Sequence, residues 1–559
     1  MPSVRARRDV SGDLGWIAGR RRTNVPRMGG AICAHSSSLV AIPPRRVTVN
    51  TAVKIIITLL PFVVLFSAFL IFKLDAFRAS LSAWTVELVI VLTFYHMSLL
   101  ASIEASLWGD LAMWTGFMVL YTGHIFGQAY RSTGLLEILL DSVQSILSSW
   151  DQKGRAVALV AIVGGFIGAF NGFATYPVTI PGLVELGFDG VYACSSYLVY
   201  FSWTLPFNSL FIAPNISNAA SHVPVVDIAH VAGLLSIPLV FLSLLGFLKI
   251  LRFRFFDWDS QILFWLVGGS NTLAIILFTQ VWPAYYILML IAGATMSLAG
   301  LYLYGSVAKR QSAPSVVGRA RSASPEPRYS ASMRFKAFAP LILGMLLVVL
   351  SRVPSVAGGL NHFQFSVAAW GYSPVAINIV TTAGFFIFIT ALVCYFFRSK
   401  NANPAKDLVA ASRRSSRSLA TLAVGSGIVY LMVDTGQIAL VGKIIASGGK
   451  FIYASLYPAL AFLGGLAFGQ GLPGDFLFSR MQVAIAPVLG VPLVLLVGIV
   501  TVVTMGPNNA LKPTQIAYTS SLANVKGRDG EIFRICLRWQ LLQLVVTAVF
   551  AVILVLVSR

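Results

Sequence analysis

The chain has 559 residues, of which 57% are hydrophobic and 11% are charged, and its mean hydropathy is +0.80. This composition excludes an ordinary soluble domain, which has a smaller apolar share and a larger charged share. The net charge of +21 is concentrated between apolar segments rather than spread along them, so it does not predict nucleic-acid binding.

Apolar runs long enough to cross a hydrocarbon layer, which takes about 20 helical residues, recur along the chain. They are continuously apolar rather than alternating with a period of two, which indicates helices and not a membrane β-barrel. We therefore expect an all-α polytopic membrane protein with roughly 12 to 14 transmembrane helices. The predicted spans are 53–72, 82–101, 110–130, 156–174, 191–213, 228–249, 262–281, 283–305, 335–352, 373–397, 416–433, 452–470, 483–504 and 538–557.

The segments outside these spans suggest four parts. Residues 1–50 form a basic N-terminal tail without a long apolar core, which is typical neither of a secretory signal nor of a spanning helix. Residues 51–305 and 335–559 are predicted to form two membrane halves. The segment 306–334 between them is rich in Ser, Arg and Pro, and its composition predicts a flexible linker.

Basic residues gather between the spans. The clusters are 5–27, 249–254, 309–334, 398–417 and 526–538. The positive-inside rule assigns such loops to the cytoplasm. An even number of predicted spans separates the middle three clusters, so this part of the topology is consistent with the rule.

Two stretches of the chain repeat the same order of glycine, proline and amide residues. The first contains Thr133-Gly134, a Gly-rich segment at 164–177, Pro206-Phe207-Asn208 and Pro214-Asn215-Ile216. The second contains Thr435-Gly436, a Gly-rich segment at 464–475, Pro507-Asn508-Asn509 and Pro513-Thr514-Gln515-Ile516. Broken apolar helices in corresponding positions of two halves point to the substrate site of a secondary transporter, because unwound backbone exposes polar groups at membrane depth. This predicts two repeat halves with broken helices, whose parallel or inverted orientation the sequence leaves open.

Polar residues at these breaks are the candidate substrate-binding residues. The glycines alone indicate close helix packing, but amides, a hydroxyl and prolines beside them indicate uncovered backbone polarity. Amides bind a carboxylate or a hydroxyl without carrying a charge into lipid. Lys512 would attract an anion, and snorkelling to the interface is its alternative role. The candidates are Asn171, Thr175, Asn208, Asn215, Gln470, Asn508, Asn509, Lys512 and Gln515.

Three ionisable residues are candidates for ion coupling. Asp475 lies deep in an apolar context, where a charge is costly and is usually functional or paired. We expect it to bind a proton or sodium, and a surface pair with Arg480 is the alternative. His124 and Asp434 are further candidates, because each lies near the Thr-Gly pair of its repeat copy.

Several of these segments resemble the L-lactate permease family. Residues 164–173 are similar to the family's Gly-Ala-Ala-Gly-Phe-Gly-Thr-Pro region, and 187–193 to the Leu-Gly-Phe and Tyr-Ala steps after it. Residues 513–517 resemble its Ser-Pro-Gln-Ser-Ile-Ala segment. Residues 526–534 resemble its Gly-Lys-Glu-Gly-Glu-Leu-Phe-Arg ending. The order and spacing of these segments carry the resemblance.

The resemblance implies a multi-pass protein of the bacterial inner membrane that carries L-lactate or a related 2-hydroxy monocarboxylate with proton symport. Gly168 and Gly471 depart from the family, which has acids there, so a carrier or exporter for another organic anion is the alternative. The expected partners are a small carboxylate, a proton or sodium ion and membrane lipid, with no nucleic acid. The sequence leaves the oligomeric state open.

Other classes of function have less support. A membrane-embedded enzyme would need paired acids or a His, Asp and Ser constellation at one depth, and the sequence has no HExxH motif, no strand-borne GxSxG and no clustered histidines. The four cysteines are scattered singly, so neither a metal site nor a cofactor is expected. A non-transport membrane scaffold would not explain two matched sets of helix breaks.

Overall fold

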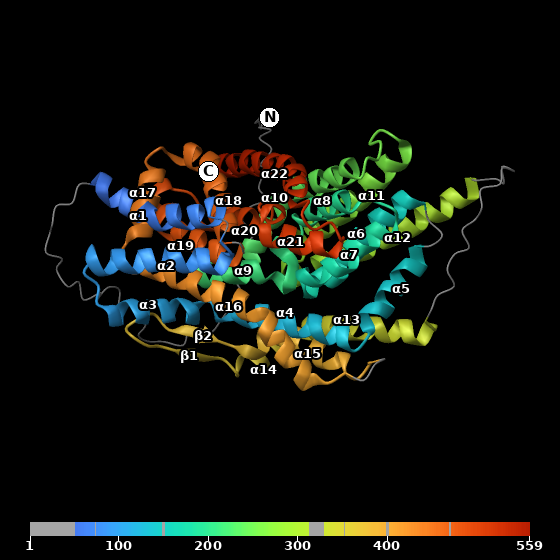
Figure 1. The fold of residues 1–559 in the computed structure, drawn as a ribbon, viewed down its shortest axis with the longest axis horizontal. Helices are drawn as coiled ribbons and strands as arrows, with labels where there is room; N and C mark the ends of the chain where they lie inside the picture. Colours follow the sequence, from blue (N-terminus) through green and yellow to red (C-terminus); the bar gives the residue numbers. More distant parts are fainter. Residues whose placement is uncertain are drawn as a thin grey trace, which may run out of the picture. The chain divides into compact units, whose positions relative to one another are not determined.

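The computed structural model describes residues 51–558, except 73, 148–150, 312–328, 352, 399–401 and 469–470. Within these ranges the chain is helical apart from loops and one antiparallel hairpin of β1 (Phe365–Val367) and β2 (Val375–Ile377) (Figure 1). Nine of the described helices are long and apolar enough to span a bilayer, and three shorter apolar helices accompany them. The predicted all-α polytopic membrane fold is confirmed. The predicted tail at 1–50 lies outside the described residues.

The helices outside the repeat copies form two groups. The first group is α1 (Thr51–Phe66), α2 (Ala76–Thr93) and α3 (Leu99–Ala112). The second group is α11 (Trp258–Ile275), α12 (Met289–Gln311), α13 (Ala331–Leu350), α14 (Pro354–Asn361) and α15 (Ala383–Cys394). Since α12 continues to Gln311 and α13 begins at Ala331, both ends of the predicted linker at 306–334 are helical, and its middle lies outside the described residues.

The two repeat copies have the same order of seven helices. The first copy is α4 (Trp114–Ser132), α5 (Leu135–Leu147), α6 (Gln152–Phe170), α7 (Tyr176–Glu185), α8 (Gly190–Phe201), α9 (Asn208–Ser221) and α10 (Val225–Ile250). The second copy is α16 (Pro404–Asp434), α17 (Gln437–Ala446), α18 (Lys450–Ala467), α19 (Gly471–Leu489), α20 (Leu493–Met505), α21 (Pro513–Leu522) and α22 (Asp529–Val557). The first helix of each copy ends in the same way, because Gly134 and Gly436 adopt positive φ angles of 78° and 72° that few other residues tolerate. The predicted broken helices are therefore present in both halves.

Five predicted spans differ from the observed helices. The span at 82–101 covers the end of α2, the non-helical residues 94–98 and the start of α3, and the span at 110–130 covers the end of α3 and most of α4. The span at 191–213 is divided into α8 and α9 by residues 202–207. The span at 373–397 begins inside the hairpin, and its helical part is α15. The span at 483–504 covers the end of α19 and most of α20, because Gly490 takes a φ of 62° and ends α19 with a turn. Continuous apolar sequence therefore conceals turns that depend on single glycines or on polar break residues.

Side-chain contacts show that the repeat copies are inverted. Gln128 and Ser132, near the end of α4, both donate hydrogen bonds to Asp407, near the start of α16. Gly116, near the start of α4, faces Leu422, further along α16. The first helices of the two copies thus run antiparallel while packed together (Figure 1). This orientation, which the sequence left open, is the inverted-topology arrangement found in many secondary transporters.

The inversion produces reciprocal contacts between the copies. Helix α9 packs on α19 as α21 packs on α7, and α10 packs on α20 as α22 packs on α8. Each broken helix of one copy is therefore supported by the other copy. This arrangement brings the breaks of both copies into one region.

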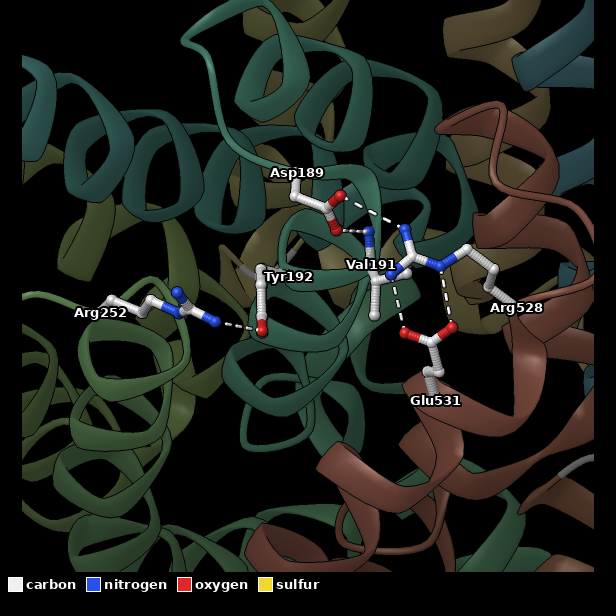
Figure 2. Close-up of polar contacts among 6 residues, drawn as sticks. All are labelled: Asp189, Val191, Tyr192, Arg252, Arg528 and Glu531. Carbon is white, nitrogen blue, oxygen red and sulfur yellow. Dashed lines mark hydrogen bonds and ion pairs between the residues drawn. The ribbon is translucent and has the colours of Figure 1, made fainter.

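A polar cluster joins the start of α8 to the start of α22. Figure 2 shows Arg528 between Asp189, at 3.3 Å, and Glu531, which it binds through two N–H groups at 2.7 and 2.9 Å. Asp189 also accepts from the backbone N–H of Val191 at 2.9 Å, which caps α8. The segments 187–193 and 526–534, which carry part of the family resemblance, thus contact each other although they are far apart in the sequence.

Candidate functional site

The first break lies between α6 and α7 and continues at the start of α9. Asn171 ends α6 with an extended backbone, and its amide donates to the carbonyl oxygen of Gly123 at 2.6 Å. Asn208 begins α9, and the three residues after it, 209–211, have φ angles of 51°, 55° and 64°. Three consecutive non-glycine residues in this left-handed region are costly, and such strain concentrates at functional sites.

Glycines allow Asn208 to lie against the break. A Cβ atom added to Gly168 would lie 3.0 Å from the amide oxygen of Asn208, and one added to Gly172 would lie 3.1 Å from its nitrogen. Gly165, by contrast, faces Ala294, which is the helix packing that glycines alone predict. The glycines of this segment therefore serve both packing and the site.

The second break lies between α18 and α19 and continues between α20 and α21. Residues 506–512 form a turn that includes a short 3-10 helix at Asn509–Leu511, and Pro513 then begins α21 with a fixed φ and no N–H to satisfy. The amide of Asn509 in this turn donates to the Tyr176 hydroxyl at 3.0 Å, and Tyr176 is the first residue of α7. A hydrogen bond thus connects the breaks of the two copies.

Both breaks line one cavity of about 670 Å³. It brings together six predicted residues, namely Asn171, Asn208, Asn509, Lys512, Gln515 and His124. They come from α4, from the first break and from the second break. A polar chamber formed by both copies is what the repeat pattern predicts for a transporter.

The cavity lining is strongly cationic. Its basic side chains are Arg131, Arg414, Arg417 and Lys512, and Asp75 is the one acid among the described residues of the lining. Lys512 is 3% exposed, so it does not extend to a lipid interface. It has no hydrogen-bond or ion-pair partner in the described part of the chain. Such a site attracts anions.

Two buried amide oxygens of the lining also have no partner among the described residues. They belong to Asn208, which is 2% exposed, and to Gln515, which is 7% exposed. Thr204 fixes the orientation of the Asn208 amide. The Thr204 hydroxyl donates to the carbonyl oxygen of Phe201 at 2.8 Å, so it accepts a hydrogen bond from the amide nitrogen of Asn208 at 3.2 Å. Buried acceptors of this kind are costly unless a ligand or water supplies a donor.

These features point to a carrier, and comparison with known proteins identifies the family. A family model described as L-lactate permease matches residues 54–558. The chain belongs to the L-lactate permease family. It is accordingly a multi-pass membrane transporter of the bacterial plasma membrane.

Individual relatives of this L-lactate permease family member are distant. An L-lactate permease from Bacillus subtilis (strain 168) is 22% identical over 568 residues, covering 89% of this chain and 95% of the relative. The YdaH transporter of Alcanivorax borkumensis aligns with a TM-score of 0.43 and 16% identity over 79% of this chain and 86% of its own. MtrF of Neisseria gonorrhoeae aligns with a TM-score of 0.38 and 11% identity over 82% of this chain and 85% of its own.

Asp475 of this permease family member is fully buried behind the cavity wall rather than in it. Its carboxylate accepts from Ser217 at 2.9 Å and from Thr504 at 3.2 Å. Ser217 is also within 2.7 Å of the Thr501 hydroxyl, so hydroxyl groups from α9 and α20 surround the carboxylate. Arg480 instead donates to the carbonyl oxygen of Ala220 at 3.2 Å, and no cation pairs with Asp475 in the described ranges.

Four further predicted residues lie away from the cavity lining. Thr175 and Asn215 bond to backbone carbonyl oxygens of Gly172 and Phe211, at 2.6 and 2.7 Å, which gives them local structural roles. Asn508 is buried and donates to Phe462 at 3.3 Å, and Asp434 is exposed and accepts from Tyr372. Gln470 lies outside the described residues.

Sequence reasoning missed the basic and amide residues that α4 and α16 of the transporter contribute to the cavity. They are Gln128, Arg131, Arg414 and Arg417. The cluster at 398–417 suggests a cytoplasmic loop, whereas α16 begins at Pro404 and extends the helix through most of it. The spacing of Arg414 and Arg417, three residues apart, was the available signal, because it places both on one helix face.

Proposed function

We propose that this transporter carries a small monocarboxylate, L-lactate or a related 2-hydroxy acid, in symport with protons. The observation that carries the proposal is Lys512, whose ammonium group is buried in the cavity without an anionic partner in the described residues. A buried, unpaired charge is costly, and a substrate carboxylate would remove that cost by pairing with it. The name of the Bacillus subtilis relative supports the choice of substrate.

The neutral polar residues of the cavity suit the rest of such a substrate. The amides of Asn171, Asn208, Asn509 and Gln515 offer donors and acceptors without adding charge. The unpartnered oxygens of Asn208 and Gln515 could each accept a hydrogen bond from a hydroxyl group. A charged anchor together with a few orienting polar groups is the usual composition of a small-ligand site.

Asp475 is the coupling carboxylate in this proposal. It is separated from the cavity by a thin wall, because Thr504, which donates to Asp475, directly precedes the lining residue Met505. With hydroxyl donors alone around it in the described residues, the carboxylate is neutralised by binding a cation. A proton is the proposed ion, and the oxygen-rich surroundings make sodium the alternative that an experiment must separate.

The test is uptake of labelled L-lactate into proteoliposomes that contain the purified full chain. An inward proton gradient should accelerate uptake by the wild type, and replacing sodium with choline should not reduce it. Asp475→Asn should lose the response to the gradient but retain lactate exchange at equilibrium. Asp227→Asn, which changes an exposed acid at the start of α10, is the matched control and should behave as wild type.

Three results would contradict parts of this proposal. Absence of uptake of any small carboxylate by the wild type would exclude the substrate class. A gradient response that persists in Asp475→Asn would remove Asp475 from the coupling mechanism, and dependence on sodium would replace the proton.

A further inference from the structure

Gln128 joins Arg414 to a buried carboxylate at one end of the cavity. Its amide nitrogen donates to Asp407 at 3.0 Å, and its amide oxygen accepts from a guanidinium N–H of Arg414 at 2.7 Å. Both polar ends of the amide are therefore used, and they can bond in one orientation only, because Asp407 accepts and Arg414 donates. The amide fixes the position of the guanidinium relative to α4.

Asp407 is satisfied without pairing directly with Arg414. The carboxylate is 6% exposed and also accepts from the hydroxyls of Ser132 at 2.5 Å and Tyr395 at 2.9 Å. It lies in the first turn of α16, where backbone N–H groups favour a negative charge. Three neutral donors and the helix end thus stabilise the carboxylate, so it does not need the guanidinium as a counterion.

Arg414 consequently keeps most of its binding capacity. A guanidinium group has five N–H donors, and the described residues occupy one of those of Arg414. The side chain lines the cavity together with Arg417, and no acid pairs with either of them in the described residues. A positioned guanidinium with free donors is well suited to bind a carboxylate through two parallel hydrogen bonds.

We propose that Arg414 is a second carboxylate-binding subsite of the cavity, held in position by Gln128 and Asp407 and distinct from the subsite at Lys512. The inference rests on the proposed function, because it assigns a further role within the same anion pathway. Lys512 belongs to the second break, whereas Arg414 lies on α16 in the basic cluster at 398–417, which the positive-inside rule places toward the cytoplasm. Arg414 therefore binds the anion on the cytoplasmic part of its path.

The position of this subsite connects it to the inverted repeat. Gln128 is on α4 and Arg414 on α16, which are the corresponding first helices of the two copies. A carboxylate bound by Arg414 would thus contact a group whose geometry depends on both copies. Gln128 and Asp407 act through Arg414, so they are positioning residues and need not contact the substrate.

The first test compares Arg414→Gln with Arg413→Gln in proteoliposomes made with neutral phosphatidylcholine. Arg413 is the neighbouring residue; like Arg414 it is exposed, but it is not part of the cavity lining, so this control removes the same charge. We expect Arg414→Gln to raise the KM for lactate exchange about tenfold with little change in maximal rate, as befits loss of a charge-assisted hydrogen bond. Arg413→Gln should leave the KM unchanged. Equal KM values for wild type and Arg414→Gln would overturn the proposal.

A second variant guards against a fold defect in the first. Gln128→Glu combined with Asp407→Asn moves one carboxylate next to Arg414 and leaves the total charge unchanged. If Arg414 binds substrate, this internal carboxylate competes for the guanidinium and raises the KM about tenfold, as in Arg414→Gln. If Arg414 has a structural role only, the new ion pair preserves it and the KM stays at the wild-type value, which would overturn the proposal.

The third arm separates a substrate carboxylate from a lipid phosphate, since a guanidinium binds both. The assay is repeated with phosphatidylglycerol in the vesicles. An effect of Arg414→Gln that occurs only with phosphatidylglycerol would assign Arg414 to lipid and overturn the proposal. Failure of the proposed function looks different, because the wild type would then exchange no carboxylate in any vesicle, and the subsite would fall with it.

Discussion

The first and second breaks have the same architecture but different charges. In the first, the polar residues that reach the cavity are neutral, namely Asn171, Tyr176, Asn208 and Ser209. In the second, the cavity receives Lys512, and Asp475 lies one layer behind the wall. Counted from the Gly-Gly pair of each copy, Asp475 occupies the place that Thr175 holds in the first copy.

The two copies thus share the architecture of the site but differ in the charges that they give it. Two inverted copies form one chamber because each broken helix needs the other copy to cover its exposed backbone. Charge at only one of the two breaks makes the chamber asymmetric. Anion binding and ion coupling are therefore expected to depend far more on the second break than on the first.

Lys512→Met should have the largest effect, because it removes the charge by which the second break differs from the first. Removing the ammonium leaves the second break as neutral as the first, and we expect carboxylate exchange to fall by about 100-fold or more, as for loss of a buried charged partner. Lys443→Met, which changes an exposed lysine at the end of α17 in the same copy, is the matched control. Exchange at the wild-type rate in Lys512→Met would show that the asymmetry of charge has no role in binding.

Corresponding glycines should differ in their tolerance of alanine. A Cβ atom on Gly464 would lie 2.0 Å from Phe478, which is buried, whereas one on Gly164 would lie 3.8 Å from Tyr200. We expect Gly464→Ala to destabilise the protein by about 1–3 kcal/mol through overpacking and Gly164→Ala to be close to neutral. Thermal unfolding of both variants in one detergent measures the difference, and equal melting temperatures would contradict the tighter packing of the second copy.

Arg528→Gln should have the smallest effect of the three. Its ion pair with Asp189 joins the two copies, whereas Glu531 lies at the start of α22 beside Arg528 (Figure 2). All three side chains are substantially exposed. Exposed pairs contribute little because water and salt screen them. We expect the melting temperature to change within experimental error at both low and high salt, and a large loss of stability would show that this contact, rather than the buried interface, holds the copies together.

The sequence predicted the breaks well because their signals are local. Pro507 and Pro513 cannot continue a helix in the ordinary way, so the polar turn between them was visible without a structure. Lys512 and Asn509 were found by the same signal, and both line the cavity. Asn508, the neighbour of Asn509, shows the limit, because the direction of a side chain in an irregular turn depends on what packs around it.

The role of α16 could not be predicted in this way. Arg414 belongs to a basic cluster of the kind that marks a cytoplasmic loop, and a local pattern cannot reveal that Gln128, from the other copy, holds it in the cavity. Asp434 shows a difference in the opposite direction. Its place beside the Thr-Gly pair suggested the site, whereas it lies at the exposed end of α16 near Tyr372, outside the cavity lining. Both outcomes depend on how α4 and α16 pair along their length.

Local sequence signals were enough to predict a helical membrane protein with two matched sets of helix breaks, because hydropathy and the backbone limits of glycine and proline act over a few neighbouring residues. The inversion of the copies became known only from the tertiary structure. The same holds for the set of polar side chains that meet in the chamber. These features depend on contacts between residues hundreds of positions apart, such as Gln128 with Arg414 and Tyr176 with Asn509. Packing of one copy against the other selects those contacts.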